Sequence, residues 1–229
     1  MGVGRKSFKV NAMQRIIVII AAGGSGTRFG SALPKQFCLL AGKPVLLHTY
    51  DRFAECLHDA TIVTVIDPER ADYVPAGSLT ARPGRTRWES VRNALEACKD
   101  VEADVILVHD GARPLPDAAM IRRVIDACRG HQGAIPVIAV TDSLRRADGT
   151  PANRADFRAV QTPQGFRADL LRRAYQLPER EDFTDDASVM SAAGFADIAM
   201  VEGSPRNIKI THPLDLKIAE LYLSDGADN

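Results

Sequence analysis

The stretch Ile16-Ile-Val-Ile-Ile-Ala-Ala-Gly23-Gly-Ser-Gly-Thr-Arg28-Phe-Gly-Ser-Ala-Leu-Pro34-Lys-Gln36 decides how this chain of 229 residues is interpreted. It opens with a continuous run of apolar, mostly β-branched residues that ends at glycine. Such a run predicts a strand that is buried on both faces, as in a parallel sheet. The first strand therefore belongs in the middle of an α/β sheet.

The second half of this stretch is a glycine-rich turn that contains two cations. Gly23, Gly24 and Gly26 allow backbone N–H groups to approach an anionic ligand closely. Arg28 and Lys35 place positive charge on either side of the same turn. Strand, glycine turn and two cations together favour a polyphosphate site.

Two common phosphate-binding motifs do not fit this turn. In the dinucleotide fingerprint the third glycine position falls on Phe29, one residue before Gly30, and the acid expected after the second strand is missing. The P-loop pattern fails because Gly42-Lys43 is followed by Pro44. Motifs of serine hydrolases and zinc proteases are absent from the sequence as well. A reaction in which an anionic phosphate attacks a nucleotide would need charge neutralisation rather than a strong base.

Composition sets the broad class. The chain has 45% hydrophobic residues and equal numbers of acidic and basic residues, 29 of each. These values suit one domain over residues 1–229, with residues 1–13 as a flexible tail. We expect neither nucleic acid nor a membrane as a partner, because binders of both are usually more basic. The four scattered cysteines predict free thiols, no zinc site and a cytoplasmic location. Cys56, Cys98 and Cys128 lie in apolar helical patterns, so we expect these three thiols to be buried.

Strand and helix patterns alternate along most of the chain. Predicted strands cover 61–66, 79–81, 105–108, 134–140, 198–201 and 207–210. Predicted helices cover 45–57, 86–99, 117–129, 167–176 and 184–193, the last with Thr184 as N-cap, and a final helix opens at 211–213 with Leu214, Ile218, Leu221 and Tyr222 facing inward. This order predicts an α/β fold of three layers, with a mainly parallel, twisted sheet and helices on both faces. The loops at Gly23, Gly84 and Asp110 should converge, because ligands bind beyond the carboxyl ends of such strands.

Residues 141–162 break the alternation. Asp148-Gly149 is a hairpin signal, and the segment carries four arginines with too little apolar content to bury itself. The residues alone leave two interpretations equally open: a mobile loop, or a protruding arm that packs on another subunit.

Several motifs resemble one family of enzymes. They are Ala-Ala-Gly-x-x-Gly-Thr-Arg and Pro-Lys-Gln in the first stretch, then His109–Pro114, Arg154, Gln161–Gln164, Thr184–Ser188 and Asn207–Thr211. In this order the set resembles sugar-phosphate nucleotidyltransferases and, more narrowly, the 2-C-methyl-D-erythritol 4-phosphate cytidylyltransferases. The resemblance extends from Arg15 to Leu223.

The resemblance implies a Rossmann-like nucleotidyltransferase with a projecting β-hairpin arm. Its activity would transfer a cytidylyl group from CTP to 2-C-methyl-D-erythritol 4-phosphate, giving CDP-methylerythritol and pyrophosphate. This is a step of isoprenoid precursor synthesis by the non-mevalonate route. Mg²⁺ would be held mainly through the triphosphate, with no protein metal ligand assigned. The enzyme would be a homodimer whose 141–162 arm reaches the neighbour's site.

The same resemblance implies roles for individual residues. Arg28 and Lys35 would hold the triphosphate, while Arg154, acting in trans, and Lys209 would position the acceptor phosphate. Substrate-binding roles would fall on Ala21, Ala22, Gly23, Gly24, Gly26, Gly84, Ser90, Asp110, Arg113, Ser143 and Thr184. Two positions depart from the family pattern: Arg85 stands where an acid is frequent, and Ser143 where threonine is frequent.

Other interpretations remain beside this one. A cytidylyltransferase for another pentitol phosphate, such as ribitol 5-phosphate, is a close alternative. A dinucleotide-dependent oxidoreductase and a nucleotide-binding module without turnover are less favoured. For single residues, Asp110 could cap a turn, Lys209 could be a solvent-facing lysine of an edge strand, and Asp186 and Ser188 fit a helix surface.

Overall fold

A computed structural model describes residues 14–24, 29 and 33–225, so the predicted tail and the predicted site residues Gly26 and Arg28 lie outside the described residues. The strands of the main sheet are β1 (Ile16–Ala21), β4 (Thr61–Val65), β5 (Leu79–Ala81), β6 (Val105–Asp110), β7 (Gly133–Ala139), β10 (Arg158–Val160), β11 (Gln164–Arg167) and β12 (Ile198–Glu202). Their order is β10-β7-β11-β6-β1-β4-β5, with β12 paired to β7. The expected parallel run therefore forms the centre and one side of the sheet.

Strand direction follows the sequence pattern with two exceptions. β1 pairs in parallel with β4 and β6, and β4 pairs in parallel with β5. β11 enters antiparallel between β6 and β7, and β10 is also antiparallel to β7. The sheet is therefore mixed but mostly parallel, as predicted for an α/β fold.

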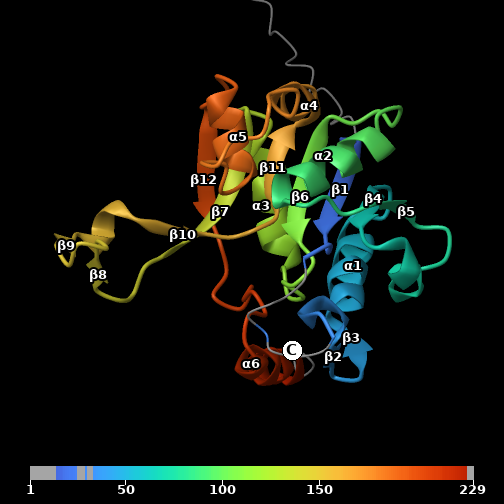
Figure 1. Ribbon diagram of the computed structural model, residues 1–229, viewed down its shortest axis with the longest axis horizontal. Coiled ribbons are helices and arrows are strands. Elements are labelled where there is room, and N and C mark those ends of the chain that lie inside the picture. The colour runs from blue at the N-terminus through green and yellow to red at the C-terminus, as the bar shows by residue number, and fades with distance from the viewer. Residues whose placement is uncertain (1–13, 25–28, 30–32, 226–229) are drawn as a thin grey trace, which may run out of the picture.

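Helices cover both faces of the sheet (Figure 1). They are α1 (Val45–Cys56), α2 (Arg87–Ala97), α3 (Ala118–Ala127), α4 (Ala168–Ala174), α5 (Asp186–Ala192) and α6 (Pro213–Ser224), with short 3-10 turns η2 (Lys35–Phe37), η3 (Pro68–Tyr73) and η4 (Arg154–Asp156). α2, α4 and α5 pack on one face, and α1 and α3 pack on the other. The predicted three-layer arrangement is confirmed.

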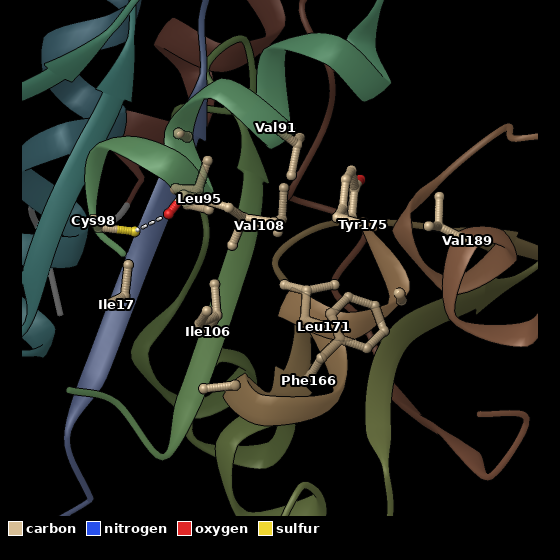
Figure 2. Packing of buried hydrophobic residues seen from close by; sticks show 14 of the residues in the cluster. Ile17, Val91, Leu95, Cys98, Ile106, Val108, Phe166, Leu171, Tyr175 and Val189 are labelled. Atoms are coloured by element: carbon tan, nitrogen blue, oxygen red, sulfur yellow. Dashed lines mark hydrogen bonds between the residues drawn. The ribbon is translucent and has the colours of Figure 1, made fainter. Parts of the chain in front are cut away.

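The side chains of β1 alternate between the two layers. Ile17 and Ile19 join the cluster under α2, α4 and α5, and Val18 and Ile20 join the cluster under α1 and α3. Figure 2 shows the first cluster, in which Ile106 and Val108 of β6 lie between β1 and Phe166 of β11. Burial on both faces explains why the run at 16–20 shows no alternation of apolar and polar residues.

The last helix differs from the prediction. Leu214 and Leu221 were expected to face inward, yet both are largely exposed. Ala219 is buried instead, and Leu216, Tyr222 and Leu223 pack against a small cluster around Leu40 of β2 (Leu39–Leu40), which pairs with β3 (Lys43–Pro44). α6 has apolar residues on more than one side, so its sequence could not determine which side is buried.

Residues 141–157 of the predicted arm project from the sheet (Figure 1). Residues 158–162 return to the sheet, because 158–160 form β10 beside β7 and Gln161 and Thr162 are buried. Within the projecting part β8 (Leu144–Arg145) pairs antiparallel with β9 (Pro151–Ala152), and Gly149 has a φ of 86° in the turn between them. A positive φ is what the Asp-Gly signal predicts. The hairpin is therefore confirmed.

Three further predictions were wrong or only partly right. Residues 207–210 form no strand, because Ile210 donates its N–H to the carbonyl of Ala112 rather than to a neighbouring strand. Asp185 rather than Thr184 caps α5, since its carboxylate accepts the N–H of Ser188 at 2.9 Å. Cys98 and Cys128 are buried free thiols as expected, but Cys56 is only half-buried.

Replacement of Gly133 by alanine should destabilise the sheet. A Cβ at Gly133 would lie 2.3 Å from Cδ1 of the buried Phe166 and 2.9 Å from the carbonyl oxygen of Gly165. We expect Gly133→Ala to lower the free energy of unfolding by about 1–3 kcal/mol, measured by urea denaturation. Gly130→Ala is the matched control, because a Cβ there meets nothing within 4 Å. Equal stability of the two variants would contradict this account of the packing.

Candidate active site

A cavity of about 510 Å³ lies at the carboxyl ends of β1 and β6. Its lining comes from segments far apart in the sequence: Ala21, Ala22, Gly23, Gly24, Phe29, Lys35, Gln36, Gly84, Arg85, Thr86, Arg87, Ser90, Asp110, Ala112 and Lys209. The loops after β1, β5 and β6 thus meet at one edge of the sheet, as predicted. This convergence follows from parallel strands whose connections all return on the helical layers.

Glycines allow these loops to approach closely. A Cβ at Gly23 would lie 2.3 Å from Cβ of Pro83, and one at Gly84 would lie 2.4 Å from Cβ of Glu89. A side chain at Gly23 would push the loops after β1 and β5 apart, and one at Gly84 would push its loop away from the first turn of α2. The glycines therefore serve the shape of the cavity as well as the exposure of backbone N–H groups.

The start of α2 forms one wall of the cavity. Thr86 caps the helix by accepting the N–H of Glu89 at 3.1 Å, while the Glu89 carboxylate accepts the N–H of Arg85 at 2.8 Å. The hydroxyl of Ser90 accepts the N–H of Gly84 at 3.0 Å and donates to the carbonyl of Thr86 at 2.8 Å. These bonds fix the backbone around Gly84.

Gln36 is a residue that the sequence analysis passed over. Its side-chain amide donates to the carbonyl oxygens of Ala22 at 2.7 Å and of Gly24 at 2.8 Å. It is buried in the first turn of η2, directly after Lys35. The amide thus ties η2 to the end of β1 and holds Lys35 at the cavity. The Pro-Lys-Gln motif contained this signal, but only its lysine was interpreted.

Asp110 ends β6 and meets three cations. Its Oδ2 lies 2.8 Å from Nζ of Lys209 and 3.5 Å from Nε of Arg113, and its Oδ1 lies 3.7 Å from Nε of Arg87. Burial alone would raise the pKa of this carboxyl, but Lys209 and then Arg87 and Arg113 outweigh it and hold the pKa well below its usual range. Asp110 is therefore ionised, and it is the one acid in the described lining of the cavity.

Contacts from the loop after β6 explain why Lys209 reaches this carboxylate. The guanidinium of Arg113 donates to the carbonyl of Asn207 at 2.8 Å, and Asn207 is itself buried. With the bond from Ile210 to Ala112, this fastens residues 207–210 along the loop after β6. Lys209 is thus an ion-paired cavity residue, and not the solvent-facing lysine of an edge strand.

A second ion pair lies behind Asp110. Arg87 donates from Nη2 to Oδ2 of Asp186 at 2.6 Å, and the hydroxyl of Tyr175 donates to Oδ1 of the same carboxylate. The side chain of Asp186 is fully buried, so its assignment to a helix surface was wrong. The adjacent aspartates at 185 and 186 fit a helix N-terminus equally well, and only the docking of α5 against α2 and α4 separates their roles.

His109 supports the same corner of the site. It is buried, its Nε2 lies 2.9 Å from the carbonyl of Arg113 and its Nδ1 lies 3.1 Å from the hydroxyl of Thr162. Burial lowers the pKa of His109 to about 4, so the ring is neutral near pH 7. Thr162 also accepts the N–H of Asp110 at 3.1 Å. The histidine therefore fixes the loop backbone.

The structure brings most of the predicted site residues together. Those that line one cavity are Ala21, Ala22, Gly23, Gly24, Lys35, Gly84, Ser90, Asp110 and Lys209. Arg113 reaches the site through Asp110. Ser143 and Arg154 lie on the arm, outside the lining of the cavity, and Thr184 is exposed just before α5.

A mostly parallel sheet with a glycine turn and a lysine-bearing cavity at the carboxyl edge of its strands defines a nucleotidyltransferase. Residues 16–225 match the family of 2-C-methyl-D-erythritol 4-phosphate cytidylyltransferases, and the chain belongs to this family. The enzyme of that name from Rubrobacter xylanophilus is 40% identical over 93% of this chain and 96% of its own length.

Two further comparisons agree. The crystal structure of the cytidylyltransferase from Thermus thermophilus matches with a TM-score of 0.73 and 32% identity, over 93% of this chain and 100% of that one. The bifunctional enzyme IspD/IspF of Rhodospirillum rubrum is 42% identical over 93% of this chain. The present chain spans 59% of the length of that bifunctional relative.

Acid should destabilise the protein through His109. Because its pKa in the folded protein is about 4 and the ordinary value is 6.5, the unfolded chain binds a proton that the folded one does not. Stability is then complete above about pH 6.5 and falls by roughly 3 kcal/mol as the pH drops toward 4. Urea denaturation across this range measures the slope.

Two variants provide the comparison. His109→Gln should flatten the slope between about pH 6.5 and 4.5, whereas His58→Gln, at an exposed position, should keep the wild-type slope. An unchanged slope in His109→Gln would show that another group causes the acid sensitivity.

Proposed function

We propose that this protein transfers a cytidylyl group from CTP to 2-C-methyl-D-erythritol 4-phosphate and releases pyrophosphate. The observation that carries the proposal is the presence of Lys35, Lys209 and the glycine turn in one cavity. Both substrates are anions, and a cavity with lysines on two sides can hold them together. Membership of the family supports the choice of both substrates.

In the proposed reaction a phosphate oxygen of the acceptor attacks the α-phosphorus of CTP. The new P–O bond forms as the bond to the β-phosphate oxygen breaks, and pyrophosphate leaves with the electron pair. The attacking oxygen is already anionic near pH 7, so the residues need only align it and neutralise charge. Lys35, together with Arg28, would bind the triphosphate, and Lys209 would hold the acceptor phosphate next to it.

The cavity suits Mg²⁺ that is bound mostly through phosphate oxygens and water. No group of three or more acidic, cysteine or histidine side chains that could hold a metal exists in the described part of the chain. Among the described lining residues Asp110 is the one acid, and its oxygens already face Lys209, Arg113 and Arg87. Magnesium fits this donor set because it keeps several waters and takes few protein ligands. When bound, it would add positive charge at the triphosphate.

Arg85 is compatible with a pyrimidine pocket at Gly84 and Ser90. Arg85 belongs to the cavity lining, but its side chain is 91% exposed and its Nε lies 3.5 Å from the Glu89 carboxylate, so it is not packed into the cavity. The backbone around Gly84 is fixed by Ser90 and Glu89 whatever side chain residue 85 carries. Cytosine would be read by this backbone and by Ser90.

We further propose a cytoplasmic homodimer in which the arm reaches the neighbour's cavity. Phe157 and Val160 near the base of the arm are exposed hydrophobic residues, as expected of a surface that a second subunit covers. Arg154 and Ser143 lie on the same arm and would enter the partner's site together, whereas Thr184 would hold the acceptor from its own subunit. None of the described helices is long and apolar enough to cross a bilayer.

Pyrophosphate release tests the function directly. Each of CTP, ATP, GTP and UTP is combined with methylerythritol 4-phosphate or ribitol 5-phosphate in the presence of magnesium. We expect release only with CTP and methylerythritol 4-phosphate. Lys35→Ala should lower kcat about 100-fold, because one preorganised charge at a developing oxyanion contributes roughly 3 kcal/mol.

The exposed Lys99 supplies the control for that variant. Lys99→Ala removes an equal charge just after α2, where the lysine pairs with Glu96 outside the cavity lining, and should keep wild-type turnover. If pyrophosphate is released with ribitol 5-phosphate and not with methylerythritol 4-phosphate, the acceptor is the alternative pentitol phosphate. Normal turnover in folded Lys35→Ala would refute the role of this lysine.

Mixed dimers test whether the arm acts in trans. Arg154→Ala and Lys35→Ala should each be nearly inactive, but their heterodimer contains one complete site. Equal mixing with full exchange should restore about a quarter of wild-type activity, because half of the dimers are mixed and each carries one intact site of two.

A second mixture controls for this result. Lys35 and Lys209 line the same cavity of one chain, so a dimer of Lys35→Ala with Lys209→Ala contains no complete site. This mixture should therefore recover no activity. Subunit exchange is verified by native mass spectrometry. Exchange without recovery in the first mixture would show that Arg154 does not complete the neighbour's site.

A further inference from the structure

Asp186 is a buried carboxylate that does not line the cavity. Its side chain is 0% exposed, and its two oxygens accept hydrogen bonds from Arg87 and Tyr175. A buried charge is costly unless it is paired and hydrogen-bonded, and here both oxygens are satisfied. The first turn of α5 is held in turn by Gln164, which donates to Asp185 at 2.9 Å and accepts the N–H of Ala187 at 3.1 Å. The fold therefore fixes the position of Asp186.

Arg87 connects this fixed carboxylate with the cavity. Nη2 lies 2.6 Å from Asp186, and Nε of the same guanidinium lies 3.7 Å from Oδ1 of Asp110. A guanidinium is planar and rigid, so anchoring Nη2 also sets the direction of the Nε–H. Burial alone would lower the pKa of Arg87, but Asp186 and then Asp110 raise it well above its usual range.

Tyr175 is the last residue of this series of side-chain contacts, which starts at Asp110 and passes through Arg87 and Asp186. It is buried, its ring stacks on Trp88 with centroids 5.9 Å apart, and Figure 2 shows it within the apolar cluster, between Val91 and Val189 in this view. A hydrophobic core on one side and a charged cavity on the other are thus joined through the chain Tyr175–Asp186–Arg87–Asp110.

We propose that Arg87 and Asp186 are positioning residues for the reaction and act through Asp110. Asp186 holds Arg87 in place, Arg87 holds Oδ1 of Asp110, and Asp110 in turn directs the ammonium of Lys209 into the cavity. The ion pairs of Asp110 with Lys209 and Arg113 are both made at Oδ2, so loss of the Arg87–Asp186 pair would leave Oδ1 without the contact to Arg87. The inference rests on the proposed cytidylyl transfer, in which Lys209 holds the acceptor phosphate.

Arg87 also lines the cavity, so direct contact with substrate is the competing explanation. The two explanations differ in their dependence on Asp110. If the pair acts through Asp110, its loss has no further effect once Asp110 has been replaced. If Arg87 contacts substrate independently, its effect multiplies with that of Asp110.

The experiment measures kcat and KM for wild type, Asp186→Asn, Asp110→Asn and the double variant. We expect Asp186→Asn to lower kcat about 10-fold while KM for both substrates changes less than about twofold. In the Asp110→Asn background the same change should lower kcat by no more than about twofold. A multiplicative loss, a rise in KM alone, or wild-type kcat in folded Asp186→Asn would each overturn the proposal.

A milder variant guards against failure of Asp186→Asn to fold. Tyr175→Phe removes only the hydroxyl that donates to Asp186 and keeps the ring on Trp88. It should lower kcat a few-fold in wild type and have no effect in Asp110→Asn. Tyr50→Phe is the control, since its hydroxyl contacts Ser78 outside the cavity lining and its loss should leave kcat unchanged. Equal kcat in Tyr175→Phe and Tyr50→Phe would overturn the proposal.

Stability provides a readout that does not depend on catalysis. Asp186 and Asp110 share Arg87, so the changes in urea midpoint caused by Asp186→Asn and Asp110→Asn should not add in the double variant. Additive changes would overturn the pairing even if wild type released no pyrophosphate with any substrate pair. Absence of pyrophosphate release from wild type with every substrate pair would overturn the proposed function. The stability measurements would then decide whether Asp186 and Asp110 are coupled through Arg87.

Discussion

The carboxylate of Asp110 is the interaction on which the rest of the site depends. It ends β6 beside β1 and is pinned by Lys209, Arg113 and Arg87, three residues from three separate segments. An ionised carboxylate in so buried a place is stable only because these cations surround it. In turn, the carboxylate holds three cations beside one cavity, where their mutual repulsion would otherwise be unfavourable. One negative charge thus organises the positive charge that anionic substrates require.

The cavity also depends on how closely the loops can approach each other. Gly23 touches Pro83, and Gly84 touches Glu89, at distances that any side chain would prevent. Gln36 then locks the turn after β1 by two hydrogen bonds to its backbone. The glycines therefore act on the shape of the site, and the glutamine makes that shape rigid. An unconstrained glycine loop could contact phosphate but could not hold Lys35 at a fixed distance from the other cations.

Much of the site could be predicted from the sequence, and the exceptions share a cause. Asp110 ends a strand, and Gly23 and Gly24 follow one closely, so local order along the chain places them at the sheet edge. Lys35 could be predicted because it belongs to the loop that the glycines open. Asp186 and Arg87 had no such signal. Both stand in the first turn of a helix, where an acid or a residue next to the N-cap is expected without any role in a site. Their roles depend on α5 packing against α2, a contact between residues far apart along the chain.

The sequence by itself determined the buried central strands, the alternation with helices, the hairpin of the arm and the glycine turn, because each is encoded by neighbouring residues. Only the tertiary structure decided that β11 enters antiparallel beside β6, that residues 207–210 run as a bonded loop, and which side of α6 is buried. It also decided the ion-pair chain behind Asp110. Such features are contacts between distant segments, and a pattern read along the chain carries no information on which charged side chains the folded sheet brings together.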